Sequence, residues 1–347
     1  MLALDIGGAH IKGYHRDGRT FHESFEVWRR PDRLGRALEG CLAQLLPFDD
    51  LAITTTAELC DCFETRREGV LAIVNATCEA LRAVAPDATL HVWTLEGQLV
   101  SRDEALQNPD LVAAANWLAL ACHAAQRFPG EPSLLADMGS TTVDLIPMRE
   151  GSPNPRERTD TGRLISGELV YTGARRTPTF ALRPVLTYRG KECPVIPELF
   201  ATMSDVYVVL GQLAENSDDR HTADGRARTR DRACERLART VGADRDSFDM
   251  NDAELLAREL AESQIELITI ALCKIASTLN EPPHTVILSG EGESIVGAAV
   301  QRQWPGVRTE SLASEISKKA SSVACAYSLV EIMTRIPARS SPGASPR

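Results

Sequence analysis

Two segments of the chain share one pattern, in which an apolar strand ends near an aspartate, a glycine turn follows, and a second strand returns. Residues 2–15 carry this pattern with Asp5, and residues 133–147 carry it again with Asp137. A strand-turn-strand unit that recurs far along a mixed α/β sequence is typical of a duplicated domain. We therefore expect an α/β fold of two similar lobes, with the two turns facing a central phosphate-binding cleft.

The composition agrees with a large α/β protein and argues against several other classes. A chain of 347 residues, 43% hydrophobic and 25% charged, can build the cores of two lobes. Its net charge of -10, with no basic run, opposes binding to nucleic acid. The first residues predict a strand instead of a signal peptide, and no apolar run reaches the roughly 18 residues of a membrane helix. We therefore expect a cytoplasmic protein that binds neither nucleic acid nor membrane.

The nine cysteines are scattered along the chain, which indicates reduced thiols instead of a disulfide framework. Cys60 and Cys62 are the one close pair. Without a second pair or clustered histidines, this pair is weak evidence for a metal site.

Apolar residues at helical spacing and short apolar runs predict the remaining elements. The predicted helices span 34–46, 70–84, 111–128, 253–279 and 317–336, and the predicted strands span 51–55, 90–93 and 285–288. Residues 151–200 are rich in Pro, Gly, Arg and Thr, which predicts loops with short strands that form either a lid or a substrate wall. We expect a first ribonuclease H-like lobe over 1–130, a second over 131–336 with an inserted loop or lid segment over about 151–250, and a disordered tail over 337–347.

The turn after Asp5 has the chemistry of an anion-binding loop. Glycines let backbone N–H groups approach a phosphate, and Lys12 can neutralise its charge. The candidate diphosphate-binding residues of this turn are Gly7, Gly8, Ala9, His10 and Lys12. Taken alone, the stretch also fits a structural hairpin with a solvated Lys12, and His10 fits either a general base or a structural residue.

The turn after Asp137 repeats the carboxylate and the glycine, and it adds hydroxyl groups that can donate to phosphate oxygens. Its candidate diphosphate-binding residues are Gly139, Ser140, Thr141 and Thr142. Carboxylates at the tips of two such hairpins suit hydrated Mg²⁺. We therefore expect Mg²⁺ ligands at Asp5, Asp137 and Asp144, and we expect Asp5, Lys12 and Asp137 to be catalytic.

These motifs and a third loop resemble known families. The two turns and residues 287–293 resemble the phosphate and adenosine loops of the actin, sugar-kinase and Hsp70 superfamily, which implies an actin-like ATPase fold with duplicated ribonuclease H-like lobes. Residues 54–70, with the Asp137 turn, resemble the hydantoinase A and oxoprolinase group. More closely, the stretches 56–63 and 66–70 resemble the tetrahydromethanopterin-linked C1-transfer protein family, and this resemblance spans nearly the whole chain.

The resemblance implies a transferase of methanofuran-type cofactor biosynthesis. In the implied reaction, the phenol of tyramine or γ-glutamyltyramine displaces diphosphate from an aminomethyl-furanmethanol diphosphate, and an ether forms. Mg²⁺, Lys12 and arginines would stabilise the departing diphosphate, and a base would take the phenol proton. The expected partners are these small-molecule substrates, and a homodimer is left open.

Four residues after the predicted strand 51–55 have alternative roles. Arg66 and Arg67 either bind diphosphate or, following a polar loop, form surface ion pairs. Glu58 and Asp61 either act as catalytic groups that hold Mg²⁺ or accept the phenol proton, or they cap the helix that follows.

The third loop lacks the paired glycines of nucleotide-using relatives. Glu291 and Glu293 would repel a nucleotide phosphate, but they can accept hydrogen bonds from a ribose or from the substrate amine. The interpretation leaves ATP binding open and does not require ATP. The expected substrate-binding residues are Gly290, Glu291, Gly292, Glu293, Arg175 and Arg176, the two arginines alternatively forming a solvated face.

Two other functions remain as alternatives. One is an ATP-dependent kinase or a hydantoinase-type amidohydrolase, and the other is a non-catalytic sensor of a phosphate ligand.

Overall fold

The computed structural model describes residues 1–335, and of Lys318 it describes only the backbone. The chain divides into two compact units. Unit 1 consists of Met1–Gly130, Arg149–Pro153 and the described residues from Ala313 onward, and unit 2 consists of Glu131–Met148 and Asn154–Leu312.

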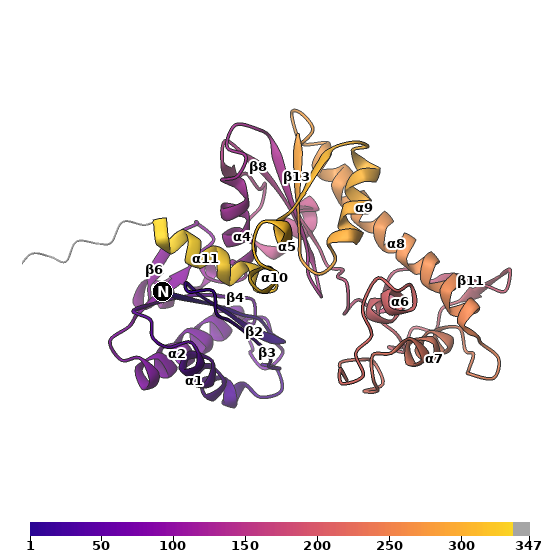
Figure 1. Cartoon of the computed structure of the whole chain (residues 1–347), viewed down its shortest axis with the longest axis horizontal. Coiled ribbons are helices and arrows are strands. Elements are labelled where there is room, and N and C mark those ends of the chain that lie inside the picture. Colours follow the sequence, from indigo (N-terminus) through magenta and orange to yellow (C-terminus); the bar gives the residue numbers. More distant parts are fainter. Residues whose placement is uncertain (336–347) are drawn as a thin grey trace, which may run out of the picture. The chain divides into compact units, whose positions relative to one another are not determined.

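Unit 1 is built on a six-stranded sheet with the order β3-β2-β1-β4-β5-β6 (Figure 1). Its strands are β1 (Leu2–Ile6), β2 (His10–His15), β3 (Thr20–Ser24), β4 (Asp50–Thr55), β5 (Thr89–Trp93) and β6 (Leu99–Ser101). The first three strands are antiparallel neighbours, whereas β1, β4 and β5 run parallel. This arrangement brings the carboxyl ends of β1 and β4 to one edge of the sheet, where α/β proteins commonly place their ligands.

The helices of unit 1 pack on its sheet. They are α1 (Leu34–Gln44), α2 (Arg66–Val84), α3 (Arg102–Gln107), α4 (Asn116–Ala125), α10 (Lys318–Ser321) and α11 (Ala324–Arg335), with short 3-10 turns at Pro31–Arg33 and Pro109–Leu111 and a third, Leu312–Ser314, where the chain passes from unit 2 to unit 1. The buried side chains of β1 and β4 form one apolar core with those of α1 and α2, and α11 packs against β1, β2 and α4. Thr65 starts α2 because its side chain accepts a hydrogen bond from the Glu68 N–H, which satisfies an open end of the helix.

Unit 2 contains a second sheet with the order β10-β8-β7-β13-β14. Its strands are β7 (Ser133–Met138), β8 (Val143–Arg149), β10 (Leu169–Val170), β13 (Thr285–Ser289) and β14 (Arg308–Ser311), whereas the short strand β9 (Ser152–Pro153) belongs to unit 1. A separate hairpin joins β11 (Val185–Tyr188) and β12 (Lys191–Pro194). The helices are α5 (Asp160–Ser166), α6 (Met203–Val209), α7 (Arg230–Thr240), α8 (Met250–Ala276) and α9 (Glu293–Gln303), with a 3-10 turn at Thr179–Ala181.

The predicted sequence repeat is a repeat of structure. In unit 1 the Gly7 N–H donates to the His10 carbonyl at 2.9 Å, and in unit 2 the Gly139 N–H donates to the Thr142 carbonyl at 3.0 Å. Each bond closes a tight hairpin between two antiparallel strands. In each unit the first strand of this hairpin also pairs in parallel with a later strand. The predicted mixed α/β fold class with duplicated lobes is therefore confirmed.

Several predicted boundaries differ from the structure. The helix expected at 111–128 begins only at Asn116, after the 3-10 turn Pro109–Leu111. The helix expected at 317–336 is two helices, α10 and α11, and it packs in unit 1 although we expected 131–336 to form one lobe. The segment expected as a loop or lid over 151–250 contains helices α5, α6 and α7. The tail predicted at 337–347 lies outside the described residues.

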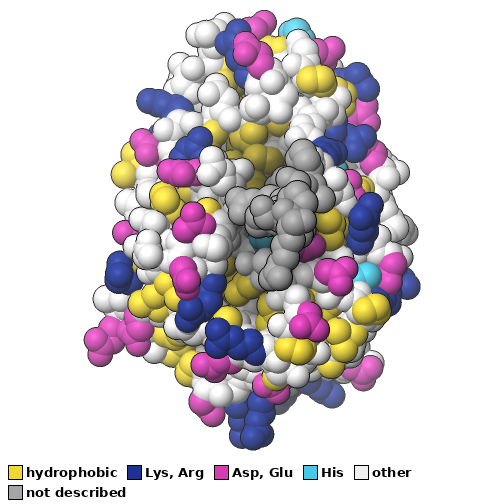
Figure 2. All heavy atoms as spheres, turned by 90° about the vertical axis from the view of Figure 1, so that its left-hand side faces the viewer, with side chains coloured by type: hydrophobic (Ala, Val, Ile, Leu, Met, Phe, Trp, Pro, Cys, Tyr) yellow, Lys and Arg dark blue, Asp and Glu magenta, His cyan; other side chains and the backbone are white. Residues whose placement is uncertain are grey.

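The described surface carries both signs of charge. Figure 2 shows one face on which basic and acidic side chains are interspersed. Within residues 1–335, no helix combines the length and the apolar character needed to cross a membrane.

Candidate active site

The Asp5 carboxylate is the buried centre of the first turn. Asp5 is 8% exposed, and its Oδ1 atom has no hydrogen-bond partner in the described part of the chain. Burial raises the pKa of Asp5 above its ordinary value, while the Lys12 charge and a hydrogen bond with the Asn116 side chain act in the opposite direction. Lys12 lies directly across the hairpin because Asp5 and Lys12 are partners in the strand register. The predicted pair is thus brought together, and Asn116 is a neighbour that sequence reasoning missed.

The glycines of the first turn permit close packing. A Cβ atom on Gly8 would lie 3.0 Å from the Cys60 Sγ atom. The carbonyls of Gly8 and Ala9 accept hydrogen bonds from the Val27 and Phe25 N–H groups at 2.9 and 3.0 Å. The turn is therefore packed against Cys60 and hydrogen-bonded to the segment 25–27.

His10 lies at the same turn in the first hairpin. Its ring packs edge-on against His22 with 5.2 Å between centroids. This contact fits a structural role and does not remove the alternative of a general base.

Glu58 is a buried carboxylate beyond the end of β4. Glu58 is 1% exposed, whereas Asp61 is exposed. A Cβ atom on Gly69 would lie 2.3 Å from the Glu58 carbonyl oxygen, so only glycine lets α2 come this close to the loop. The alternative role of Glu58 or Asp61, capping the following helix, is wrong because Thr65 is the cap.

Arg66 and Arg67 follow a loop, as the sequence indicates, and they are the first two residues of α2. Arg66 is half-buried and Arg67 is exposed. Their predicted contact with diphosphate stays a prediction.

The second turn is covered by the segment that contains Arg175. The Ala174 N–H donates to the Gly139 carbonyl at 3.0 Å, and the Arg176 N–H donates to the Ser140 carbonyl at 2.9 Å. A Cβ atom on Gly173 would lie 2.4 Å from the Ser140 carbonyl carbon, which explains a glycine at this position. The structure therefore brings the predicted arginine segment to the predicted phosphate turn within unit 2.

The third loop reaches the same turn from β13. Gly290 has φ +87°, and a Cβ atom there would lie 2.3 Å from the Met138 carbonyl oxygen and 2.9 Å from an oxygen of Asp137. The Gly292 N–H donates to the Met138 carbonyl at 2.9 Å. Glu293 is the first residue of α9. Residues around Asp137, Arg175 and Gly290 thus form one cluster in unit 2.

Charged groups surround Arg175 in this cluster. Its Nε donates to Glu291 Oε1 at 2.7 Å, and its Nη1 lies 3.5 Å from Asp219 Oδ2. Asp219 also accepts from Arg228 at 2.9 Å. Partial burial acts to raise the pKa of Asp219, but hydrogen bonds from the His221 N–H and Arg228, with the charges of Arg228 and Arg175, hold that pKa below its ordinary value. The sequence did not predict Asp219, nor the pairing of Arg175 with Glu291.

The Asp144 carboxylate is shared with a buried arginine. It lies across the hairpin from Asp137, but its carboxylate forms an ion pair with Arg163, which is 1% exposed. The guanidinium offsets part of the charge that Asp144 could offer a cation, and its contact uses the Oδ1 atom. The assignment of Asp144 as a Mg²⁺ ligand stays a prediction, and a bound ion would share this carboxylate with Arg163. Within the described residues, no group of three or more His, Cys, Asp or Glu side chains is placed to hold a metal ion.

A buried polar network supports the Arg175 segment from behind. The Gln264 amide donates to Thr172 Oγ1 at 2.7 Å and to the Gly173 carbonyl at 2.9 Å, and its oxygen accepts from the Tyr207 hydroxyl at 2.5 Å. Buried polar groups with their partners satisfied fix one conformation. Helix α8 therefore determines where the segment beside the second turn lies.

Together, these features define an α/β protein in which a strand-turn-strand hairpin is repeated in two units, and the comparisons with known proteins identify its family. The chain belongs to the hydantoinase/oxoprolinase family, whose model matches residues 50–329. It is 32% identical over 305 residues to the (4-{4-[2-(gamma-L-glutamylamino)ethyl]phenoxymethyl}furan-2-yl)methanamine synthase of Methanocaldococcus jannaschii, covering 86% of this chain and 88% of that protein. It is 28% identical over 167 residues to the protein of the same name from Methanococcus vannielii, covering 48% of this chain and 74% of that protein.

Solved structures with a similar chain course include an archaeal actin homolog, Ta0583, in complex with ADP. The TM-score is 0.43 at 14% identity, covering 96% of this chain and 99% of that chain. Nucleotide-free acetone carboxylase gives a TM-score of 0.47 at 11% identity, covering 86% of this chain and 48% of that chain, so this chain spans about half of its length. The fold assignment itself rests on the strand order of the two sheets.

Proposed function

We propose that this chain is an enzyme of methanofuran-type cofactor biosynthesis. In the proposed reaction, the phenol oxygen of tyramine or γ-glutamyltyramine attacks the furylmethyl carbon of an aminomethyl-furanmethanol diphosphate. The carbon–oxygen bond to diphosphate breaks, an ether bond forms, and the phenol proton passes to a base. The observation that carries the proposal is the similarity to a synthase whose name describes a phenoxymethyl-furan methanamine. The two chains are 32% identical over a match that covers 88% of that synthase.

The second turn supports the diphosphate-releasing step. Departing diphosphate carries away the bonding electron pair, so the protein must stabilise negative charge. Hydroxyl groups of Ser140, Thr141 and Thr142 can donate to its oxygens, and Arg175 supplies a guanidinium next to this turn. Because Arg175 is paired with Glu291, diphosphate must compete with that carboxylate.

The first turn supports a cation-dependent role for Asp5. Burial disfavours its charged form, and the Lys12 charge favours it. A Mg²⁺ ion would act in the same direction as Lys12, and Asp5 Oδ1 has a free acceptor position. We therefore propose Asp5 as a Mg²⁺ ligand in unit 1 and Asp137 in unit 2, where Asp144, paired with Arg163, is the second candidate. Bound Mg²⁺ would supply charge stabilisation for the leaving diphosphate.

The proton acceptor is proposed from three candidates. Glu58 is a buried carboxylate, Asp61 an exposed one, and His10 lies in the first turn. A base must reach the phenol oxygen in the bound complex, so single substitutions separate the three. The base variant should lower kcat more than it changes KM, with a shifted pH profile.

The test is a mass-spectrometric assay of the purified chain with Mg²⁺, the furanmethanol diphosphate and either phenolic amine, with and without ATP. We expect an ATP-independent ether and released diphosphate. Asp5→Asn and Asp137→Asn should each lose most of this activity. Asp50→Asn is the matched control, because Asp50 begins β4 and pairs with His91 outside the turns.

Other outcomes would support different functions. ATP hydrolysis without formation of the ether would favour the kinase or hydantoinase-type alternative, and the hydantoinase type agrees with the name of the family. Tight binding of the diphosphate substrate without turnover of any kind would favour a sensor. Either result would refute the transferase proposal.

A further inference from the structure

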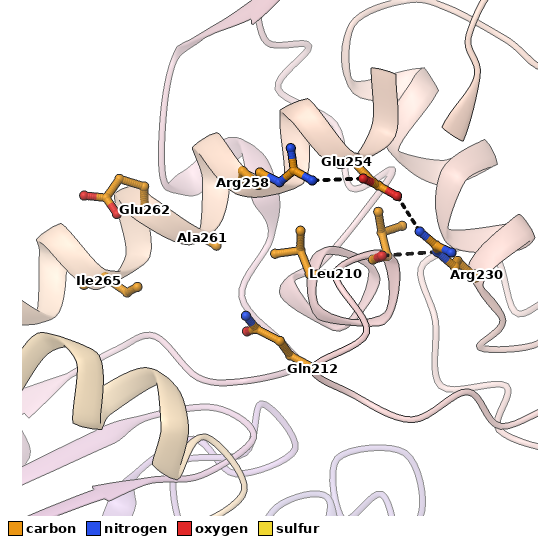
Figure 3. Close-up of a pocket in the computed structure, with 9 residues that line it drawn as sticks. Leu210, Gln212, Arg230, Glu254, Arg258, Ala261, Glu262 and Ile265 are labelled. Carbon is orange, nitrogen blue, oxygen red and sulfur yellow. Dashed lines mark hydrogen bonds and ion pairs between the residues drawn. The ribbon is translucent and has the colours of Figure 1, made fainter. Parts of the chain in front are cut away.

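A pocket in unit 2 lies apart from the residues assigned above. It has a volume of about 480 Å³ and lies between the end of α6, the first residue of α7 and one side of α8. Its polar lining includes Gln212, Arg230, Glu254 and Arg258, and Leu210 and Ala261 contribute apolar surface (Figure 3). This size is typical of sites for small molecules.

Three charged side chains of the pocket are linked by two ion pairs. The Glu254 carboxylate lies between the two arginines, 2.5 Å from Arg230 and 3.0 Å from Arg258 (Figure 3). Arg230 is also tied to the end of α6 through the Val209 carbonyl at 3.2 Å. One carboxylate between two guanidinium groups leaves one positive charge and several N–H donors for a ligand.

The fourth charged residue of the lining does not cancel this excess. Glu262 points away from the other charged groups in Figure 3, and it forms an ion pair with Arg302 at 2.7 Å. That pairing lowers the pKa of Glu262, so this residue stays charged and occupied by Arg302. The positive charge of the two pocket arginines is therefore directed to whatever enters between α6 and α8.

We propose that this pocket binds an α-amino-acid group, with its α-carboxylate on Arg258 and Arg230 and its α-ammonium on Glu254 and the Gln212 amide oxygen. Guanidinium groups bind carboxylates through paired hydrogen bonds, and an ammonium group needs an acceptor such as Glu254 nearby. A dicarboxylate would place its second negative charge near Glu254, and a simple amine would meet the arginines. The arrangement therefore fits a zwitterion better than either.

Two sources carry this group. One is a free α-amino acid. The other is the glutamyl end of a γ-glutamylated phenolic amine, and this second source rests on the proposed function. The pocket is connected to the candidate site through α8, because Ala261 and Ile265 line the pocket while Gln264 holds the segment at the second turn. Occupation of the pocket can therefore influence the position of that segment.

The test is isothermal titration calorimetry of the full chain with L-glutamate, γ-L-glutamyltyramine, tyramine and glutarate, without the diphosphate substrate. We expect L-glutamate or γ-L-glutamyltyramine to bind more tightly than tyramine and glutarate. Arg258→Gln should weaken that binding by about tenfold or more, as expected for the loss of a charge-assisted pair. The matched control is Arg183→Gln, because Arg183 is an exposed arginine of the same unit that pairs with Glu259 outside the pocket.

The outcomes separate the sources and the proposals. If Arg258→Gln weakens the binding of γ-L-glutamyltyramine alone, the pocket binds the proposed substrate. If the variant weakens the binding of L-glutamate, the pocket binds a free amino acid. Absence of binding by both, or equal affinities in wild type and Arg258→Gln, overturns the inference. Arg258 is 62% exposed, so its replacement should not unfold the chain, which circular dichroism checks. Because no turnover is measured, failure of the transferase proposal leaves this result interpretable.

Discussion

The buried histidine of α4 allows a quantitative prediction of how the free energy of unfolding changes in acid. His123 is 6% exposed, neither ring nitrogen has a hydrogen-bond partner in the described part of the chain, and its ring packs edge-on against Tyr327 at 5.2 Å. Burial, followed by the charges of Arg335 and Arg127, lowers the pKa of His123 from 6.5 to about 4. The folded chain therefore keeps this ring neutral at pH values where the unfolded chain binds a proton.

The sign and size follow from proton linkage. Between pH 6.5 and about 4 the unfolded state binds the additional proton, so the stability supported by neutral His123 is complete above pH 6.5 and is lost as pH falls toward 4. At about 1.4 kcal/mol for each pH unit, the loss approaches about 3 kcal/mol. Other carboxylates also titrate in acid, so only a comparison with a variant isolates the histidine.

His123→Phe keeps an aromatic ring against Tyr327 and removes the titrating group. We expect wild type to lose about 3 kcal/mol more than this variant between pH 7.5 and 4. The free energy of unfolding is measured with urea and tryptophan fluorescence, which reports mainly unit 1 because Trp28, Trp93 and Trp117 belong to it.

The control for this experiment is His284→Gln, since His284 is 56% exposed. It should leave the pH dependence of the wild type unchanged. Equal pH dependence of wild type and His123→Phe below pH 6.5 would refute the reasoning.

Three further predictions concern unit 2. Gly173→Ala should lower kcat/KM of the proposed reaction by about tenfold or more with an unchanged circular dichroism spectrum, because its Cβ atom would displace the second turn. Glu291→Gln should leave Arg175 with Asp219 as its one charged partner of the two described here and lower the apparent KM for the diphosphate substrate, an effect that shrinks in high salt; an unchanged KM would contradict the competition. Arg163→Gln should reduce the free energy of unfolding by about 3 kcal/mol, measured with urea, because it leaves Asp144 without its buried partner.

Local patterns made the two hairpins predictable. Each hairpin is set by an apolar strand, a glycine turn and a returning strand that follow one another in sequence, so no distant contact is needed to recognise it. For the same reason, Asp5, Lys12 and the residues of the Asp137 turn were found where the structure has them. Their joint action on one ligand stays a prediction.

The missed residues depend on contacts between distant segments. Asn116 reaches Asp5 and Gln264 reaches Thr172 only after the helices have packed, and neither side chain is marked in the sequence. Helix α7 was missed because its sequence is rich in charged residues; Arg236 is fully buried there and pairs with Asp205 at 2.6 Å. Because a charged residue takes one of the buried positions of this helix, the apolar periodicity on which helix prediction depends is interrupted.

The packing of α11 has a consequence for the order in which the chain acquires structure on the ribosome. Unit 1 begins with β1, but it needs the late segment Ala324–Arg335 to cover β1 and β2. Unit 2 ends at Leu312, so all of its residues have been synthesised before that segment emerges. Domains generally fold as units during synthesis. We therefore expect the second unit in the sequence to be completed first, while the first waits with an uncovered sheet face, and this interval is when the nascent chain most needs a chaperone.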